Sequence, residues 1–157
     1  MREHTEHTKR PESDPGPAAE TALGTAVLRI AAAVEEHAED EAERVASAAL
    51  AVPHTHGAVA IASATDRLLT RVEGLAAGIE YIPVCRRGAR GVGVLARWET
   101  LKAKGPAPDP LGNWSYMRDL AHLARDMVRV LRDHRTAEQP KGFVGRPGMP
   151  PLMPSAP

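Results

Sequence analysis

Residues 118–135 read RDLAHLARDMVRVLRDHR, a seven-residue unit that starts with Arg-Asp, occurs twice and begins a third time. Seven residues are close to two turns of an α-helix, so each Arg-Asp pair returns to the same edge of the helix. Apolar side chains fill the positions between the pairs: Leu120, Ala121, Leu123, Ala124, Met127, Val128, Val130 and Leu131. Because this row is too wide for a two-stranded coiled coil, it predicts a helix that packs against neighbours on two sides.

Two long helices are predicted before this one, joined by a short turn. From about residue 18 to residue 51, apolar residues recur at helical spacing and predict one buried stripe: Leu23, Val27, Ile30, Val34, Ala38, Ala42, Val45 and Ala49. From about residue 57 to residue 81, a second set recurs every seven residues: Ile61, Leu68, Leu75 and Ile82. The turn at residues 53–57 is short, so the two helices are expected to form an antiparallel hairpin.

A shorter helix is predicted from about residue 92 to residue 104, after a loop at residues 83–91, PVCRRGARG. The last helix begins at Asp109, with Pro110 in its first turn, or at Asn113, and it ends near Arg135. The predicted fold class is therefore all-α, a four-helix bundle of three longer helices and one short helix. Residues 18–135 are expected to form a single domain.

The two ends of the chain differ in composition from this domain. Residues 1–17 are rich in charge and proline, and residues 136–157 contain six prolines and three glycines. Segments of this kind bury too little apolar surface to offset the entropy of ordering, so both are predicted to be disordered tails. The N-terminal residues lack the apolar segment of a secretory signal, and Cys85 is the only cysteine, which together predict a cytoplasmic protein.

The net charge of zero conceals an asymmetry between the two halves of the chain. Residues 1–80 carry 7 basic and 14 acidic side chains, a net charge of −7, and residues 81–157 carry 13 basic and 6 acidic ones, a net charge of +7. Such asymmetry suggests either contact with nucleic acid or an acidic helix packed beside a basic one. The second interpretation is favoured, with the acidic residues 35–43 paired to arginines of the last helix.

A concentration of arginines and aromatic residues is the strongest candidate binding site. Arginines bind phosphates and stack on bases, and aromatic rings also stack on bases. The alternative is that the tryptophans fill the end of an alanine-rich bundle, and this alternative is favoured because buried aromatic residues usually serve packing. The candidate residues are Tyr81, Arg86, Arg87, Arg90, Arg97, Trp98, Trp114 and Tyr116.

Other chemical motifs are weak. Three glycines at residues 88–93 lack the Lys-Ser/Thr of a P-loop and the preceding strand of a dinucleotide fold. His54 and His56 offer two metal ligands, but His37 lies roughly 25 Å away along a straight helix, so no metal site is predicted. Cys85 precedes two arginines that lower a thiol pKa, yet no spacing places a base beside it.

These patterns predict a small cytoplasmic interaction or regulatory protein that is not an enzyme and needs no cofactor. Its expected partner is another protein or a second copy, the latter through an exposed part of the apolar row on the last helix. The alternative is a nucleic-acid-associated protein that uses the arginine-rich loop and short helix from Arg86 to Arg97. No contact with a membrane is expected, because no apolar run is long enough to cross one.

Overall fold

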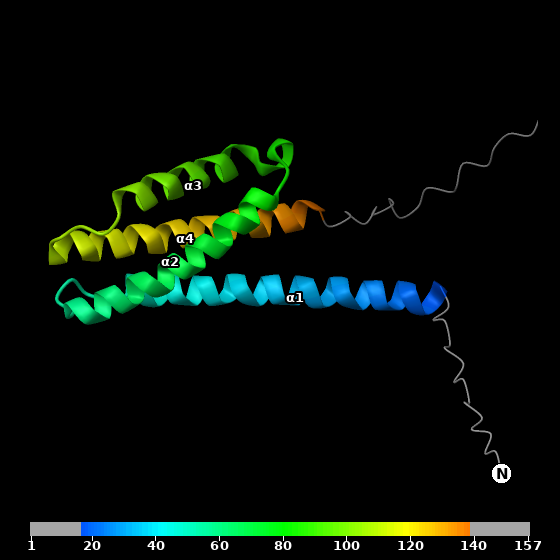
Figure 1. Ribbon diagram of the computed structural model, residues 1–157, viewed down its shortest axis with the longest axis horizontal. Helices are drawn as coiled ribbons and strands as arrows, with labels where there is room; N and C mark the ends of the chain where they lie inside the picture. The colour runs from blue at the N-terminus through cyan, green and yellow to red at the C-terminus, as the bar shows by residue number, and fades with distance from the viewer. Residues whose placement is uncertain (1–16, 139–157) are drawn as a thin grey trace, which may run out of the picture. The chain divides into compact units, whose positions relative to one another are not determined.

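The computed structural model describes residues 17–138, which form four helices (Figure 1). These are α1 (Pro17–Leu50), α2 (Ala58–Tyr81), α3 (Val84–Lys104) and α4 (Pro110–Glu138). The prediction of an all-α, four-helix fold is confirmed. The predicted tails lie outside the described residues, except that Pro17 begins α1 and residues 136–138 extend α4 beyond its predicted end. None of the described helices combines the length and the apolar character needed to cross a bilayer.

The chain divides into two compact units, and the boundary falls inside α1. The first unit is Met1–Glu41, and the second is Ala42–Pro157. The second unit therefore contains the C-terminal part of α1 and all of α2, α3 and α4. The single domain expected for residues 18–135 stays a prediction.

Helix α4 is the centre of the second unit and packs against both α2 and α3 (Figure 1). Nearly its whole predicted apolar row is buried: Leu120, Ala121, Leu123, Ala124, Met127, Val128 and Val130. Two neighbours are required to cover a row of this width, as the heptads predicted. The row is thus used mainly inside the chain, and a homodimer contact through an exposed part of it stays a prediction.

Helices α1 and α2 contribute different kinds of side chain to this core. The seven-residue spacing of α2 places Ile61, Leu68, Leu75 and Ile82 in buried positions, as predicted. From α1, the buried residues of this unit are small: Ala42, Ala46 and Ala49. Alanine lets a neighbouring helix approach closely, because the distance between two helix axes follows the size of the side chains at their contact.

Helix α3 begins earlier than its sequence predicts, and the expected loop at residues 83–91 is wrong. Pro83 is the N-cap residue, and its carbonyl accepts hydrogen bonds from the backbone N–H groups of Arg86 and Arg87. The helix is interrupted only at Gly88, with φ 65° and ψ 171°. This region of φ/ψ space is open essentially to glycine alone, so Gly88 makes a local kink where the composition suggested a loop.

The structure shows which of the two predicted N-cap residues begins α4. The Asp109 carboxylate accepts a hydrogen bond from the N–H of Gly112 at 2.7 Å, and the Asp109 carbonyl accepts one from Asn113 at 3.0 Å. Pro110 is the first helical residue, where its lack of an N–H costs nothing. Asp109 is therefore the cap, and Asn113 lies within the first turn.

Candidate interaction site

The first half of α1 carries five large apolar side chains that are exposed, and four of them, all except Leu28, share one face. Leu23, Val27, Ile30 and Val34 have exposed fractions of 67%, 56%, 64% and 63%. We refer to these four residues as the α1 stripe. The sequence predicts that they are buried together with Ala42 and Ala49, and for this half of the helix that prediction is wrong.

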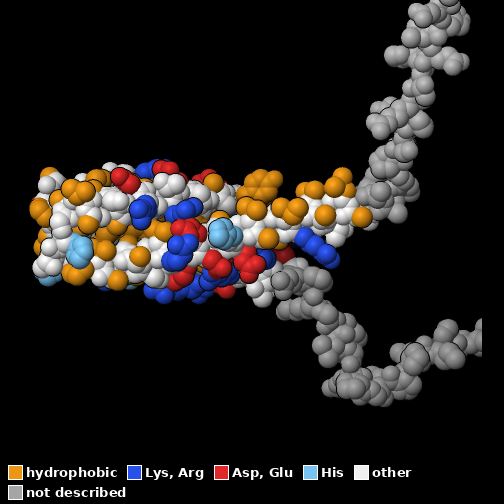
Figure 2. All heavy atoms as spheres, turned by 90° about the horizontal axis from the view of Figure 1, so that it is seen from below, with side chains coloured by type: hydrophobic (Ala, Val, Ile, Leu, Met, Phe, Trp, Pro, Cys, Tyr) orange, Lys and Arg blue, Asp and Glu red, His pale blue; other side chains and the backbone are white. Residues whose placement is uncertain are grey.

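The four residues share one face because of their spacing. Intervals of four, three and four residues keep successive side chains within a narrow sector of a helix with 3.6 residues per turn. The positions that border this sector hold only small residues, Gly24, Ala26, Ala31 and Ala33. In the space-filling view, hydrophobic side chains follow the end of the helix that adjoins the grey N-terminal residues (Figure 2). The α1 stripe is thus a continuous apolar surface with small margins.

Every side chain from Thr21 to Ala38 is exposed. Other exposed large apolar residues, such as Val59 and Leu111, are scattered singly over α2–α4, as on any protein surface. A row of four on one face differs from this background, since a contiguous apolar surface marks an interaction site.

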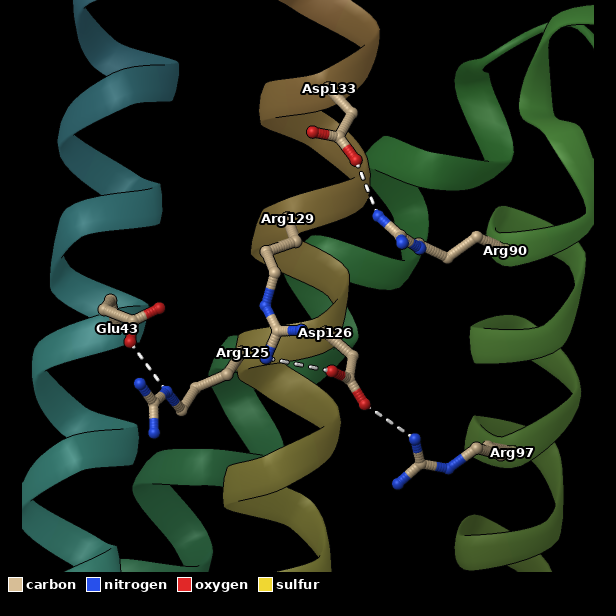
Figure 3. A network of polar contacts seen from close by, with 7 residues as sticks. All are labelled: Glu43, Arg90, Arg97, Arg125, Asp126, Arg129 and Asp133. Carbon is tan, nitrogen blue, oxygen red and sulfur yellow. Dashed lines mark hydrogen bonds and ion pairs between the residues drawn. The ribbon is translucent and has the colours of Figure 1, made fainter.

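In the second unit, the Arg-Asp repeat of α4 is used for contacts within the chain. Arg97 Nη1 donates to Asp126 Oδ2 at 2.7 Å, and Arg90 Nη1 donates to Asp133 Oδ2 at 2.8 Å (Figure 3). The two arginines are seven residues apart on α3, and the two aspartates are seven apart on α4. The matched spacing sets an antiparallel register in which Asp126 and Asp133 face α3. A third ion pair, Arg86 with Glu138 at 2.9 Å, follows at the end of α4.

Two arginines of the same repeat face the C-terminal part of α1. Arg125 Nε donates to Glu43 Oε1 at 2.7 Å (Figure 3). Seven residues earlier, Arg118 Nη1 donates to the backbone carbonyl of Leu50 at 3.0 Å. The Arg-Asp pair is therefore two-sided, with arginine directed to α1 and aspartate to α3. The predicted pairing of the acidic residues 35–43 with arginines of the last helix is observed at Glu43.

Two arginines also supply positive charge and hydrogen bonds to the C-termini of other helices. Helices α1 and α2 have no basic residue in their last turn, where positive charge favours the helix dipole. Arg118 supplies that charge to α1 through Leu50, and Arg87 supplies it to α2 by donating to the carbonyls of Glu80 and Ile82 at 2.7 and 3.0 Å. Arg118 also lies over the ring of Trp114, 4.9 Å from its centroid.

The predicted aromatic and arginine cluster is divided among several environments. Trp98 and Tyr116 are buried in the core, and Tyr81 is 93% exposed at the end of α2. Trp114 is partly buried at the turn between α1 and α2, where its Nε1 donates to the carbonyl of Val52 at 2.8 Å. Of the arginines, Arg86, Arg90 and Arg97 pair with α4 and Arg87 caps α2. The eight residues do not form one surface, and their role in binding stays a prediction.

Burial changes the chemistry of one of these aromatic residues. Desolvation raises the pKa of the Tyr116 phenol above its ordinary value, because the charged phenolate is disfavoured away from water. Lys102 lies over the ring of Trp98, 5.5 Å from its centroid, and its hydrogen bond to Glu99 raises the lysine pKa. Both shifts move the pKa away from neutrality, so neither group changes its charge near pH 7.

An open cavity of about 810 Å³ lies between the start of α3 and the end of α4. It is lined in part by Arg86, Arg90, His134, Asp133 and Glu138. The positive charge of this cavity is matched by carboxylates that already bind the two arginines. Arg87, the third arginine of the lining, donates to backbone carbonyls of Glu80 and Ile82, so the net positive charge of the cavity is small.

The remaining candidates are isolated side chains. Within residues 17–138, no three histidine, cysteine, aspartate or glutamate side chains are grouped so that they could hold a metal ion. The Cys85 thiol is exposed at the start of α3. His54 makes an edge-on contact with the ring of Trp114, with 6.0 Å between centroids. Its position is explained by packing at this turn.

Comparison with protein-family models, with curated protein sequences and with solved structures found no match to this chain. The candidate site therefore has to be argued from its own geometry. A signal in the sequence could have indicated the α1 stripe: its large residues give way to alanine from Ala38 onward. Small residues fit the part of the helix that packs closely, whereas Leu, Ile and Val occupy the part that its own unit leaves exposed.

Proposed function

We propose that the protein is a small cytoplasmic helical-bundle protein that acts by binding another protein chain, without catalytic activity of its own. The α1 stripe is the interaction face in this proposal. The observation that carries it is that four large apolar residues on one face of α1 are each more than half exposed. Removing one such side chain from water contributes about 1.5–3 kcal/mol. Covering four of them therefore favours binding of a partner with an apolar surface.

The physical character of a lone helix supports this role. An isolated helix is marginal in water, and helices in proteins gain most of their stability from packing of an apolar face. Residues 21–38 have helical backbone and alanine-rich composition, but their apolar face has no cover within the described residues. A partner helix would supply this cover by inserting side chains between those of the stripe, the mode used by helix-in-groove and coiled-coil complexes.

Cytoplasmic location is part of the proposal and is supported by cysteine chemistry. A single thiol cannot form a disulfide within the chain, and Cys85 is exposed. An exposed free thiol suits a reducing compartment. The alternative of nucleic-acid binding by Arg86, Arg90 and Arg97 has less support, because each of these arginines is paired with a carboxylate of α4.

Site-specific photo-crosslinking tests this proposal. A photoreactive amino acid replaces Val27 of the stripe in one variant and Val59 of α2 in the matched control, since Val59 is also an exposed valine, 84% accessible. After irradiation in cells, we expect a defined covalent adduct from position 27 and none from position 59. Equal labelling at the two positions, or no adduct at position 27, would overturn the proposal.

A further inference from the structure

We infer that the partner of the α1 stripe is the α1 stripe of a second copy of this chain, bound in antiparallel orientation. This inference rests on the proposed function and names its partner. Four features of α1 carry it: the symmetry of its spacing, the small residues at its borders, the position of its acidic residues and the size of its apolar face.

The spacing of the stripe is the same in both directions along the helix. The intervals from Leu23 to Val27, Ile30 and Val34 are four, three and four residues. When two copies run antiparallel, Leu23 meets Val34 of the second copy, and Val27 meets Ile30 of the second copy. Each of the four stripe residues of one copy then contacts a stripe residue of the other copy. A two-fold axis requires this self-complementarity, since each contact must occur twice.

The borders of the stripe permit close approach. In the heptad that places Val27 and Val34 at position a, the flanking positions e and g are Gly24, Ala26, Ala31 and Ala33. These positions usually hold charged side chains that select partners in coiled coils. With only glycine and alanine there, no like charges repel and the axes can approach closely.

The acidic residues that follow the stripe select the antiparallel orientation. Glu35, Glu36, Glu39, Asp40 and Glu41 lie immediately after Val34. In a parallel pair the two acidic segments would lie side by side and repel each other. In the antiparallel pair, the exposed Glu35 lies about 20 Å from Glu35 of the second copy at 1.5 Å per residue. That distance exceeds a Debye length of about 8 Å at physiological ionic strength, so the repulsion is largely screened.

The apolar area of the stripe fits a weak, reversible interface. At about 25 cal/mol per Å², 1.5–3 kcal/mol corresponds to roughly 60–120 Å² for a side chain that goes from fully exposed to fully buried. The four residues are 56–67% exposed, so four from each of two copies, with the bordering alanines, give roughly 500–800 Å², the size of a transient contact. Self-association is therefore expected to be reversible and dependent on protein concentration.

Disulfide trapping in the full-length chain tests both the partner and its orientation. Replacing the exposed thiol, Cys85→Ser, removes the natural cysteine, and Leu23→Cys and Val34→Cys are then made separately. Under mild oxidation we expect little dimer from either variant alone. An equimolar mixture should give the mixed disulfide, recognised by its mass, because only that pair comes within the 4.4–6.8 Å between Cα atoms that a disulfide needs. The two Leu23→Cys sites lie about 16 Å apart along the antiparallel pair.

Sedimentation of the unmodified chain and a matched pair of variants complete the test. Val27→Glu with Ile30→Glu should shift the dimer to monomer, whereas Leu28→Glu, on the opposite face and 72% exposed, should leave it dimeric. A dimer trapped by Leu23→Cys alone would overturn the antiparallel arrangement. A monomer at every concentration would overturn self-association. The proposed function would still stand if Val27 crosslinked to a chain of different mass, and would fail if Val27 formed no adduct.

Discussion

Arg97 of α3 and Asp126 of α4 are joined by a 2.7 Å hydrogen bond that belongs to an antiparallel series of ion pairs. Asp126 also accepts a longer contact from Arg129, one helical turn away at 3.3 Å (Figure 3). The two side chains keep 51% and 29% of their surface exposed, so water screens their attraction. The pair is expected to fix the register of α3 on α4 more than to add stability.

This role predicts a small coupling energy between the two residues. A double-mutant cycle with Arg97→Ala and Asp126→Ala should give about 0.2–1 kcal/mol, the range of exposed pairs. The exchanged pair, Arg97→Asp with Asp126→Arg, should recover most of the free energy of unfolding lost by either single reversal. Urea denaturation measures both quantities. A coupling of several kcal/mol would show that the pair behaves as a buried ion pair.

Arg118 is expected to contribute more than the ion-paired arginines. Its replacement by methionine keeps the aliphatic stem but removes the hydrogen bond to Leu50 and the contact with Trp114. The loss should be about 1.5–3 kcal/mol, as for hydrogen bonds that involve a charged group. Arg129→Met, whose side chain is 62% exposed, is the control and should change the midpoint of urea denaturation very little. Similar losses in the two variants would refute the capping role of Arg118.

Two glycines of α3 should respond in opposite directions to alanine. Gly88→Ala places a side chain at φ 65° and ψ 171° and should cost about 1–3 kcal/mol. Gly93 lies within the helix with no atom near the position of an added Cβ, so Gly93→Ala should stabilise by about 0.5–1 kcal/mol. Thermal unfolding of both variants distinguishes the effects. If Gly88→Ala were neutral, the kink would not be imposed by its backbone conformation.

Stability should fall at alkaline pH because of Tyr116. Its folded pKa is raised above the unfolded value, so the phenol contributes its full stability below the unfolded value of about 10. As pH rises, the unfolded chain loses its proton first, and the contribution is lost as pH passes through the folded pKa. Urea denaturation between pH 8 and pH 11, values that bracket the tyrosine range, should show a shallower decline for Tyr116→Phe. Tyr81→Phe, at an exposed position, should match the unmodified chain throughout.

The sequence predicts the parts of the fold that depend on local periodicity. The heptads of residues 118–135 and the seven-residue spacing from Ile61 to Ile82 identify buried faces, and the structure confirms both. Asp109 was one of two chemically equivalent caps, and only the position of Gly112 relative to its carboxylate decides between them. Such choices depend on three-dimensional arrangement that a linear pattern does not contain.

The sequence could not predict what covers each apolar face. Leu23 and Ala49 belong to one continuous pattern, yet the first is 67% exposed and the second is 2% exposed. Periodicity identifies a face that favours burial, but the covering element depends on the lengths and packing of the other helices. The prediction of a loop at residues 83–91 is wrong for a related reason. Only Gly88 adopts non-helical backbone angles, and the helix continues on both sides of it.

Hydrogen exchange at two protein concentrations tests the interaction role of α1 most directly. The account predicts that amides of residues 25–38 exchange slowly in concentrated protein and faster on dilution, while amides of the α4 core do not change. Val27→Glu with Ile30→Glu should give fast exchange of residues 25–38 at both concentrations. Protection of these residues that is unaffected by dilution and by the double variant would contradict an α1 stripe that depends on a second copy for its cover.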